Sequence, residues 1–347
     1  MAISTAAFSP SAFQFLIAEQ DVFGTFEGAG DNAYHALDVD SVGTPSLNPN
    51  QVLDVRAGSR VLQATDFFHD ARASVKEISV SGTATTNALD MLLENIMGEA
   101  EGSASGVYSF ASNASATSVG ASDSSDQAGK LLSIAILTGQ TNGSSLANSQ
   151  LSFKDCVCTS LTLSGDMGTE GGRIKFSATF KTGSNVEDLT DAATTVDTAF
   201  TAASENYLMS VWAAGYRQII GVADLVMSSF SLTLENDAAF VGITSTGFEV
   251  ISRAGEFSAT LDATIKYDDK CEDMFEKFNS TTTGASAGAT LLNNDSSLTD
   301  ANFGISMPGS VLTNVAFSEG TMMMLNVSVK AVGSGIGSGT ALVEVSC

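Results

Sequence analysis

The chain has 347 residues, a length that allows one large core or two of ordinary size. It carries 15 Lys and Arg against 39 Asp and Glu, a formal net charge of -24, which argues against a protein that holds DNA or anionic lipid through phosphate contacts. Only 16% of the residues are charged, against a usual fraction of about 25%, so the surface suits permanent contacts between subunits.

The N-terminal segment lacks the features of an export signal. Its apolar patch, residues 13–17, has no positively charged segment before it, since the first basic residue is Arg56. No apolar run approaches the length that crosses a membrane. We therefore expect no membrane partner.

Apolar residues that alternate with small hydroxyl residues predict strands in the first half, each with one buried and one polar face. These strands cover residues 75–82, 131–137, 157–163 and 174–180. After the first strand, an apolar stripe closed by Gly98 predicts a short helix that lies against a sheet, over Leu89, Leu92, Leu93, Ile96 and Met97. Residues 102–127 are too poor in large apolar groups to pack. The glycines of residues 167–172 suit a tight hairpin turn.

The second half shows the same kinds of pattern after a polar, acidic linker over residues 182–206. Its predicted strands cover residues 226–234, 257–267, 302–307, 323–331 and 341–345. A helix is predicted over residues 269–278, where Asp269 and Glu272 have the spacing of a capping box. Residues 279–300 form a second stretch that is too polar to pack.

The order of strand, helix, polar stretch, strand and hairpin occurs twice, which predicts an internal duplication. We expect an N-terminal β-sandwich domain over residues 1–185, a linker over residues 186–221 and a C-terminal β-sandwich domain over residues 222–347. The words Ser-Leu-Thr-Leu, at residues 160–163 and 231–234, and Phe-Ser-Ala-Thr, at residues 176–179 and 257–260, also recur. These words fall out of register with the larger repeat, so shared strand composition is the alternative explanation for them.

Catalytic signatures are missing from the sequence. His35 and His69 are the two histidines, and neither lies near a nucleophile motif. The acids are scattered through polar loops and nominate no acid and base pair. We therefore expect no enzyme activity, no catalytic residue and no cofactor.

Two metal or phosphate motifs and the cysteines also fail as sites. The segment that starts at Asp38 resembles a calcium loop, but its twelfth position is Pro49 instead of Glu. The glycines of residues 333–339 have the wrong spacing for a phosphate loop. The four cysteines are Cys156, Cys158, Cys271 and Cys347, and their spacing is too irregular for a disulfide framework or a zinc site. We therefore interpret them as reduced, buried thiols and expect no metal site.

Two parts of the sequence resemble the hairpins of phage tail tube proteins. The first is residues 153–165 with 174–183, and the second is residues 229–236 with 251–268. The likeness extends from about residue 65 onward. The resemblance implies a mainly β fold of β-sandwich domains with one flanking helix each. It also implies long hairpins that join edge to edge into a closed β-barrel in the oligomer. Rings of about six such domains would stack into a tube, with three chains in each ring if the chain is duplicated and six if it is not.

The resemblance also implies a function and partners. The chain would be a structural subunit of a virion tail, assembled in the bacterial cytoplasm, through which double-stranded DNA passes during genome delivery. Its partners would be further copies of itself and the tape measure, tail terminator and baseplate proteins. The alternatives are another virion structural protein, such as a capsid or decoration protein, and a β-rich adhesin or fibre module.

Two expectations concern the strands that would form the barrel. Basic residues on their polar faces are expected to pair with Asp262 or Glu235 or to bind between rings, namely Arg173, Lys175, Lys181, Lys266 and Lys330. The hairpin over residues 157–180 is expected to lie at the contact between subunits. Proline at Thr162, or a shorter turn over residues 165–172, would then abolish assembly and leave a soluble monomer.

Overall fold

The structure is a computed structural model that is mainly β, as expected, with two α-helices among the residues it describes. These residues are 14–20, 23–24, 26, 34–43, 45, 50–53, 61, 66–70, 74–98, 106–111, 131–137, 150–186, 196–197, 212–242, 248, 250–279, 288–293, 303–318, 322–333 and 341–347.

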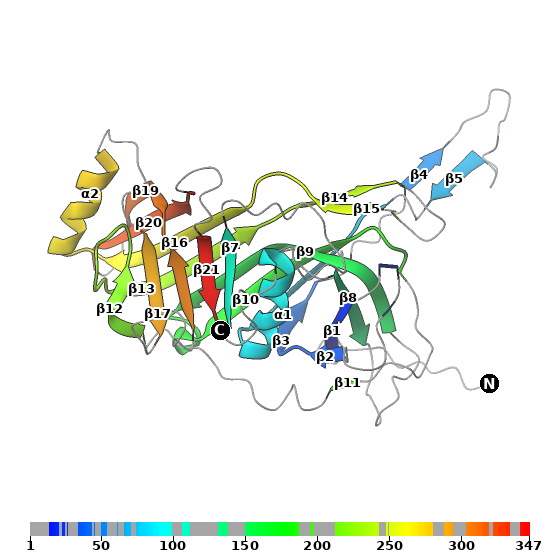
Figure 1. Ribbon diagram of the computed structural model, residues 1–347, viewed down its shortest axis with the longest axis horizontal. Helices are drawn as coiled ribbons and strands as arrows, with labels where there is room; N and C mark the ends of the chain where they lie inside the picture. The colour runs from blue at the N-terminus through cyan, green and yellow to red at the C-terminus, as the bar shows by residue number, and fades with distance from the viewer. Residues whose placement is uncertain are drawn as a thin grey trace.

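The main sheet runs through both halves of the chain, and neighbouring strands are antiparallel throughout (Figure 1). Its eight strands are, in order across the sheet, β3 (Val39–Val42), β6 (Lys76–Thr83), β10 (Ile174–Thr182), β9 (Gln150–Asp166), β13 (Met227–Glu235), β16 (Ser258–Lys266), β20 (Met324–Ala331) and β19 (Ser310–Ser318). Alternation along these strands buries their apolar side chains on one face, where they form the main core. In the single chain this sheet is open, with β3 and β19 at its edges, so the described residues form no closed barrel.

Strand β9 is longer than the sequence predicted and belongs to two sheets. Its first part pairs with β8 (Leu131–Leu137), which continues into β1 (Gln14–Gln20), β2 (Tyr34–Ala36) and β11 (Val196–Asp197). Asp155, with φ of 54°, lies at an irregularity of the β8–β9 ladder, two residues before the part that pairs with β10. Its buried carboxylate accepts hydrogen bonds from Gln20 Nε2 at 2.6 Å, Gly24 N at 2.7 Å and Ser184 Oγ. These bonds hold the strand as it passes from one sheet to the other.

A five-stranded sheet covers the core from the other side, and three of its strands lie where none was predicted. Its order is β12 (Trp212–Gln218), β17 (Ala289–Asn293), β18 (Gly304–Met307), β21 (Ala341–Ser346) and β7 (Val107–Ala111). The expectation that residues 102–127 and 279–300 cannot pack was wrong at β7 and β17, because Tyr108, Leu291 and Leu292 are buried. Residues 112–127 and 294–300 lie outside the described residues.

The two helices differ in their surroundings. Helix α1 (Thr86–Met97) is capped at its start by Thr85. It ends at Gly98, as predicted, and this glycine has a φ of 98° and donates its N–H to Glu94 O. It is buried between β9 and β7. Helix α2 (Glu272–Asn279) follows a 3₁₀ turn over Asp269–Cys271 and packs on β19, leaving much of its surface exposed. Asp268 caps that turn in place of the expected Asp269, since its carboxylate accepts from Lys270 N.

The sequence did not predict two short hairpins that leave the main sheet. One is formed by β4 (Asn50–Leu53) and β5 (Phe67–Asp70), and it projects from the body in Figure 1. The other is formed by β14 (Ala238–Val241) and β15 (Val250–Arg253), and it packs on β8 and β9. Both pair in the same register, first residue against last.

The elements of the two halves follow the same order. In the first half β3, the β4–β5 hairpin, β6, α1, β7, β8, β9 and β10 follow one another, and in the second half β13, the β14–β15 hairpin, β16, α2, β17, β18, β19 and β20 do so. The four main-sheet strands of each half also lie in the same spatial order.

Irregularities in the main sheet also match between the halves. The β9–β10 ladder has a bulge at Thr159, whose hydroxyl donates to Thr179 O at 3.3 Å. The β19–β20 ladder has a bulge at Thr313, whose hydroxyl donates to Ser328 O at 3.0 Å. The ladders of β3 with β6 and of β13 with β16 shift register at corresponding points. Because bulges sit at specific positions, these matches align the halves residue by residue.

Candidate assembly surface

The exposed face of the main sheet is lined by hydroxyl and amide side chains, and we call it the hydroxyl face. These residues include Ser79, Ser81, Ser160, Thr162, Ser164, Ser177, Thr179, Ser229, Ser231, Thr233, Thr260, Thr264, Asn326 and Ser328. Cross-strand bonds join several of them, such as Thr162 to Thr233 at 3.3 Å across the middle of the sheet and Thr264 to Asn326 at 3.0 Å. The face is therefore polar and is held by neutral hydrogen bonds.

Charges of both signs occur on the hydroxyl face. Its strands carry Lys175, Lys181, Lys266 and Lys330 and the acids Glu77, Asp166, Glu235 and Asp262, and Asp40 and Asp237 are two further acids beside the lysines. Lys175 pairs with Asp40 at 2.7 Å, and Lys181 pairs with Asp237 at 2.8 Å and lowers the pKa of that carboxyl. The partners of these two lysines thus differ from those expected, and the carboxylate of Asp262 accepts a hydrogen bond from Ser328.

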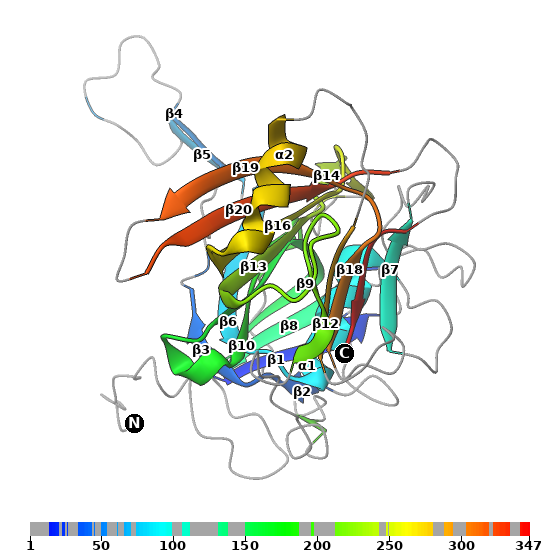
Figure 2. The ribbon, with the colours of Figure 1, turned by 90° about the vertical axis from the view of Figure 1, so that its left-hand side faces the viewer.

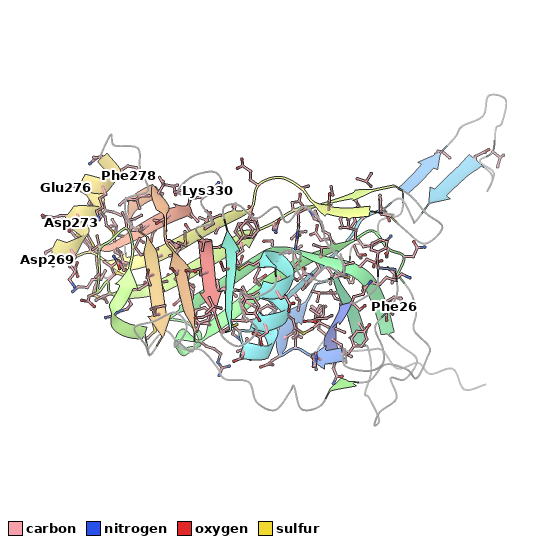
Figure 3. The ribbon with its side chains drawn as sticks, viewed as in Figure 1. Phe26, Asp269, Asp273, Glu276, Phe278 and Lys330 are labelled. Atoms are coloured by element: carbon pink, nitrogen blue, oxygen red, sulfur yellow. The ribbon has the colours of Figure 1, made fainter. Side chains whose placement is uncertain are left out.

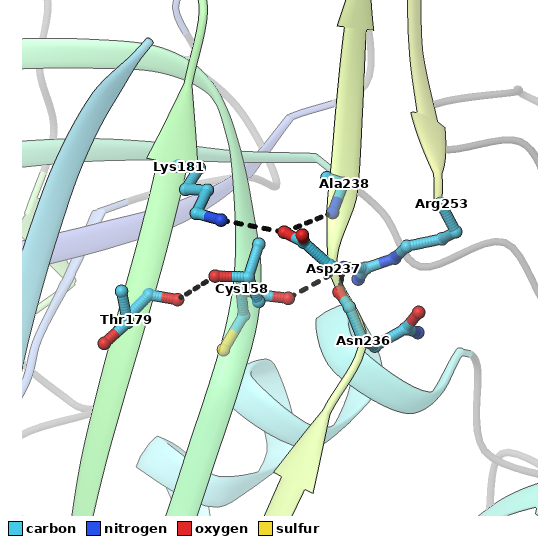
Figure 4. A network of polar contacts seen from close by, with 8 residues as sticks. Cys158, Thr179, Lys181, Asn236, Asp237, Ala238 and Arg253 are labelled. Carbon is cyan, nitrogen blue, oxygen red and sulfur yellow. Dashed lines mark hydrogen bonds and ion pairs between the residues drawn. The ribbon is translucent and has the colours of Figure 1, made fainter. Parts of the chain in front are cut away.

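The two halves meet at a junction formed by the β9–β13 ladder and the C-terminal end of α1 (Figure 4). Arg253 Nη1 donates to Cys158 O at 2.8 Å and to Asn236 O at 2.7 Å, and its Nη2 donates to Asn95 O. Asn236 Nδ2 donates to Ile96 O at 2.8 Å, and Asn95 Oδ1 accepts from Cys158 N at 2.6 Å. Two residues of the second half thereby bind the last carbonyls of α1, which no helical N–H can reach. Burial lowers the pKa of Arg253 to about 10.

Among the described residues, the β19 end of the main sheet has no such cover. There α2 lies beside β19 (Figure 2). Phe275 stacks on Phe317 with 5.5 Å between ring centroids. Phe278 and Phe317 are partly exposed, and Figure 3 shows Phe278 on the outermost element of this end. Exposed acids line the outer side of α2 and the turn before it, namely Asp269, Glu272, Asp273 and Glu276. A monomer seldom leaves several large apolar groups exposed along one sheet edge, which marks this end as a contact surface.

The strand at this edge has backbone groups that are free to pair. Asn236 N donates to Thr159 O, so alternate residues of β9 after the bulge, beginning with Leu161, bond to β13. Val315 of β19 corresponds to Leu161 of β9, since each is the second residue after the bulge in its strand. The N–H of Val315 therefore points away from β20, toward the open edge.

The hairpin over residues 157–180 lies inside the main sheet and not at the edge where subunits were expected to meet. Within the chain β9 pairs with β10 on one side and β13 on the other, so it is a central strand. The expectation that proline at Thr162 leaves a soluble monomer was wrong, because it would break the interior of the main sheet. The turn itself is as predicted, with Gly171 and Gly172 at φ of 68° and 77°.

The candidate catalytic and ligand-binding motifs stay apart. His35 is in β2 and His69 is in the β4–β5 hairpin. Asp40, of the calcium-like segment, is paired with Lys175, and residues 334–339 of the glycine-rich segment lie outside the described residues. Among the described residues no cluster of three His, Cys, Asp or Glu could hold a metal ion, and no helix is long and apolar enough to cross a membrane.

The four thiols are expected to react slowly in the folded chain. Three are buried, and burial is the first cause that raises every thiol pKa, to about 12 for Cys158 and well above the usual value for Cys156 and Cys347. Because the thiolate is the reactive form, a disulfide reagent at pH 8 should label all four thiols only after unfolding in guanidinium. Labelling of the native chain at the rate of the unfolded chain would contradict this prediction.

The chain was also compared with known proteins. The profile of one family, described as phage tail tube protein, matches residues 12–331. No curated protein sequence matches the chain.

Proposed function

Since the chain belongs to the family of phage tail tube proteins, we propose that three copies of it close into a ring and that such rings stack into a hollow conduit for genome delivery. The family is structural, and membership makes the chain a component of a virion tail that assembles with itself into a tube. The proposal assigns it no catalytic residue, cofactor or metal.

The observation that supports three chains is the eight-stranded main sheet with its two matching halves. Each half supplies four strands in the same order, with bulges at the same places. We infer that the chain is an internal duplication, with one unit in residues 1–185 and the other in residues 222–347, joined by residues 186–221. About six units in a ring then correspond to three chains, and joining β19 of one chain to β3 of the next would close the sheet into a barrel.

The hydroxyl face is the surface that we assign to the lumen. The other face of the main sheet is apolar and covered by α1 and the second sheet, so it cannot line a channel. DNA is held mainly by cations that replace its counterions. On this face Lys175 and Lys181 are engaged by acids and the remaining groups are mostly neutral hydroxyls. Such a surface would let double-stranded DNA pass without gripping it.

Stacking of rings, and attachment of other tail proteins, require contacts on the two faces of the ring. We assign contacts between rings to the turns at the two ends of the main-sheet strands. The ends of the finished tube would contact the tape measure, tail terminator and baseplate proteins, with assembly in the bacterial cytoplasm before release of the virion.

Electron microscopy and native mass spectrometry of the purified chain test this function. We expect hollow tubes of uniform bore, built from rings of three chains. Shells, or trimers that bind a shell, would indicate a capsid or decoration protein instead. A discrete particle that binds glycan and never forms rings would indicate an adhesin or fibre module.

A further inference from the structure

Three apolar side chains along the free C-terminal edge are exposed, and we call them the edge triad. Val311 is 41% exposed and Phe317 is 53% exposed, both in β19, and Phe278 of α2 is 46% exposed. The matching halves provide a buried counterpart for each of these positions.

The counterparts follow from the register of the two halves. Val157 pairs with Lys181 just before the Thr159 bulge, as Val311 pairs with Lys330 before the bulge at Thr313. Leu163 and Phe317 are both the fourth residue after their bulge. Asn95 and Phe278 are both ten residues beyond their helix caps, Thr85 and Asp268. Within the chain all three counterparts are buried, Val157 and Leu163 at 0% exposure and Asn95 at 1%.

The second half of the chain provides the cover over these counterparts. Val157 packs with Ala238 and Ile251 of the β14–β15 hairpin, and Arg253 of that hairpin reaches the end of α1 beside Asn95. Leu163 is paired with Leu232 of β13. A hairpin and a sheet edge thus cover one half of the chain at the junction.

The same two covering elements exist in the first half and are unused there. The β4–β5 hairpin, like β14–β15, forms a two-stranded sheet of its own with the same register, but it projects from the body (Figure 1). Strand β3 corresponds to β13 but is an edge strand of the main sheet. One end of the chain therefore has an uncovered triad, and the other end has the matching cover.

We propose that the edge triad is the docking site for the first half of a second copy, whose β4–β5 hairpin covers Val311 and Phe278 and whose β3 edge continues the sheet next to Phe317. The inference rests on the proposed function and specifies its ring contact. This contact between chains has the same arrangement as the junction between the two halves of one chain, except at one side chain. At the position of Asn95, which accepts a backbone hydrogen bond, α2 has the apolar ring of Phe278, so this part of the contact between chains is made by apolar burial.

A disulfide between chains tests this contact directly. Val311→Cys places a thiol at the counterpart of Val157, and Asn50→Cys places one at the counterpart of Ala238, the first residue of its hairpin. Tubes of the double variant, formed under reduction and then oxidised, should yield covalently linked chains up to the trimer on a non-reducing gel. Each single variant should remain as separate chains.

A second pair of variants covers the case in which the double cysteine chain does not assemble. Phe278→Asp should lose tubes while the melting temperature of the monomer stays unchanged, and Phe278→Leu should keep them. Normal tubes from Phe278→Asp, or tubes of the double cysteine variant that yield no linked chains, would overturn the placement of the contact and leave the tube function standing. A wild-type chain that never forms rings would instead refute the proposed function.

Discussion

Replacing Val315 with proline is expected to abolish rings and tubes while the chain remains a folded monomer. Proline removes the backbone N–H of β19 that points toward the open edge, and its ring blocks a strand that approaches there. The hydrogen bonds between β19 and β20 use other residues of the strand, so the fold within the chain is kept. Loss of assembly should be complete in electron microscopy and sedimentation, because a ring with one broken contact in each chain cannot close.

Val315→Ala is the matched control for this variant. Val315 packs partly against the core, so both substitutions lose side-chain contacts, at a cost of about 1 kcal/mol. Only proline removes the N–H, so Val315→Ala should still form tubes. Normal tubes from Val315→Pro, with a circular dichroism spectrum like that of the wild type, would exclude β19 as the edge that joins chains.

The sequence predicted the strands well because each has one apolar and one hydroxyl face. Nine predicted strands are found, several with the same bounds or bounds that differ by one residue, as for β8 and β20. This alternation reports burial of one face only. It contains no information on which edges are paired, so β9 looked like a strand that joins subunits although it has two partners in the same chain.

The recurring sequence words have a simple explanation in the structure. Ser160 to Leu163 and Ser231 to Leu234 lie opposite each other on β9 and β13, with Leu163 paired to Leu232. The counterpart of β9 in the order of elements is β19, so the words reflect two central strands of similar surroundings. The matching of the halves depends instead on order and bulges, and a bulge depends on pairing that no local pattern reveals.

The acidic composition was a poor guide to the surface that matters. The net charge of -24 suggested a lumen that repels DNA, but the hydroxyl face also carries lysines, two of which are paired with acids. Much of the excess acid is found elsewhere, for example on the outer side of α2. Composition constrains the whole molecule, while the charge of one face depends on which strand positions point outward.

Arg253 was not recognised as important because its partners are far away in sequence. It lies in a short hairpin strand and donates to carbonyls of residues 95, 158 and 236, which meet only in the folded chain. The neighbouring residues gave no signal, since a buried arginine and an exposed one look alike in sequence.

Arg253→Met is expected to lower the free energy of unfolding by about 3–5 kcal/mol, because it removes the donor of three hydrogen bonds to partly buried carbonyls. Burial disfavours the charged form of the guanidinium and lowers its pKa to about 10. The loss therefore comes from the missing hydrogen-bond donor and not from the missing charge, because methionine has no donor. Since that pKa is well above neutrality, Arg253 is charged in the folded and unfolded chain near pH 7, and the loss should not vary between pH 6 and 8.

The measurement is best made on the Val315→Pro chain, so that unfolding is not coupled to disassembly of tubes. Guanidinium unfolding followed by circular dichroism gives the free energy, and Lys330→Met is the matched control. Lys330 is exposed on the hydroxyl face, so the control removes the same charge and should change stability by less than about 0.5 kcal/mol. If Arg253→Met were no more destabilising than Lys330→Met, the hydrogen bonds of Arg253 would contribute nothing to holding the two halves together. If it is destabilising as expected, the guanidinium stabilises the junction between the halves at a place where α2 offers the next chain only the ring of Phe278. Separation of chains should then require less free energy than separation of the halves of one chain.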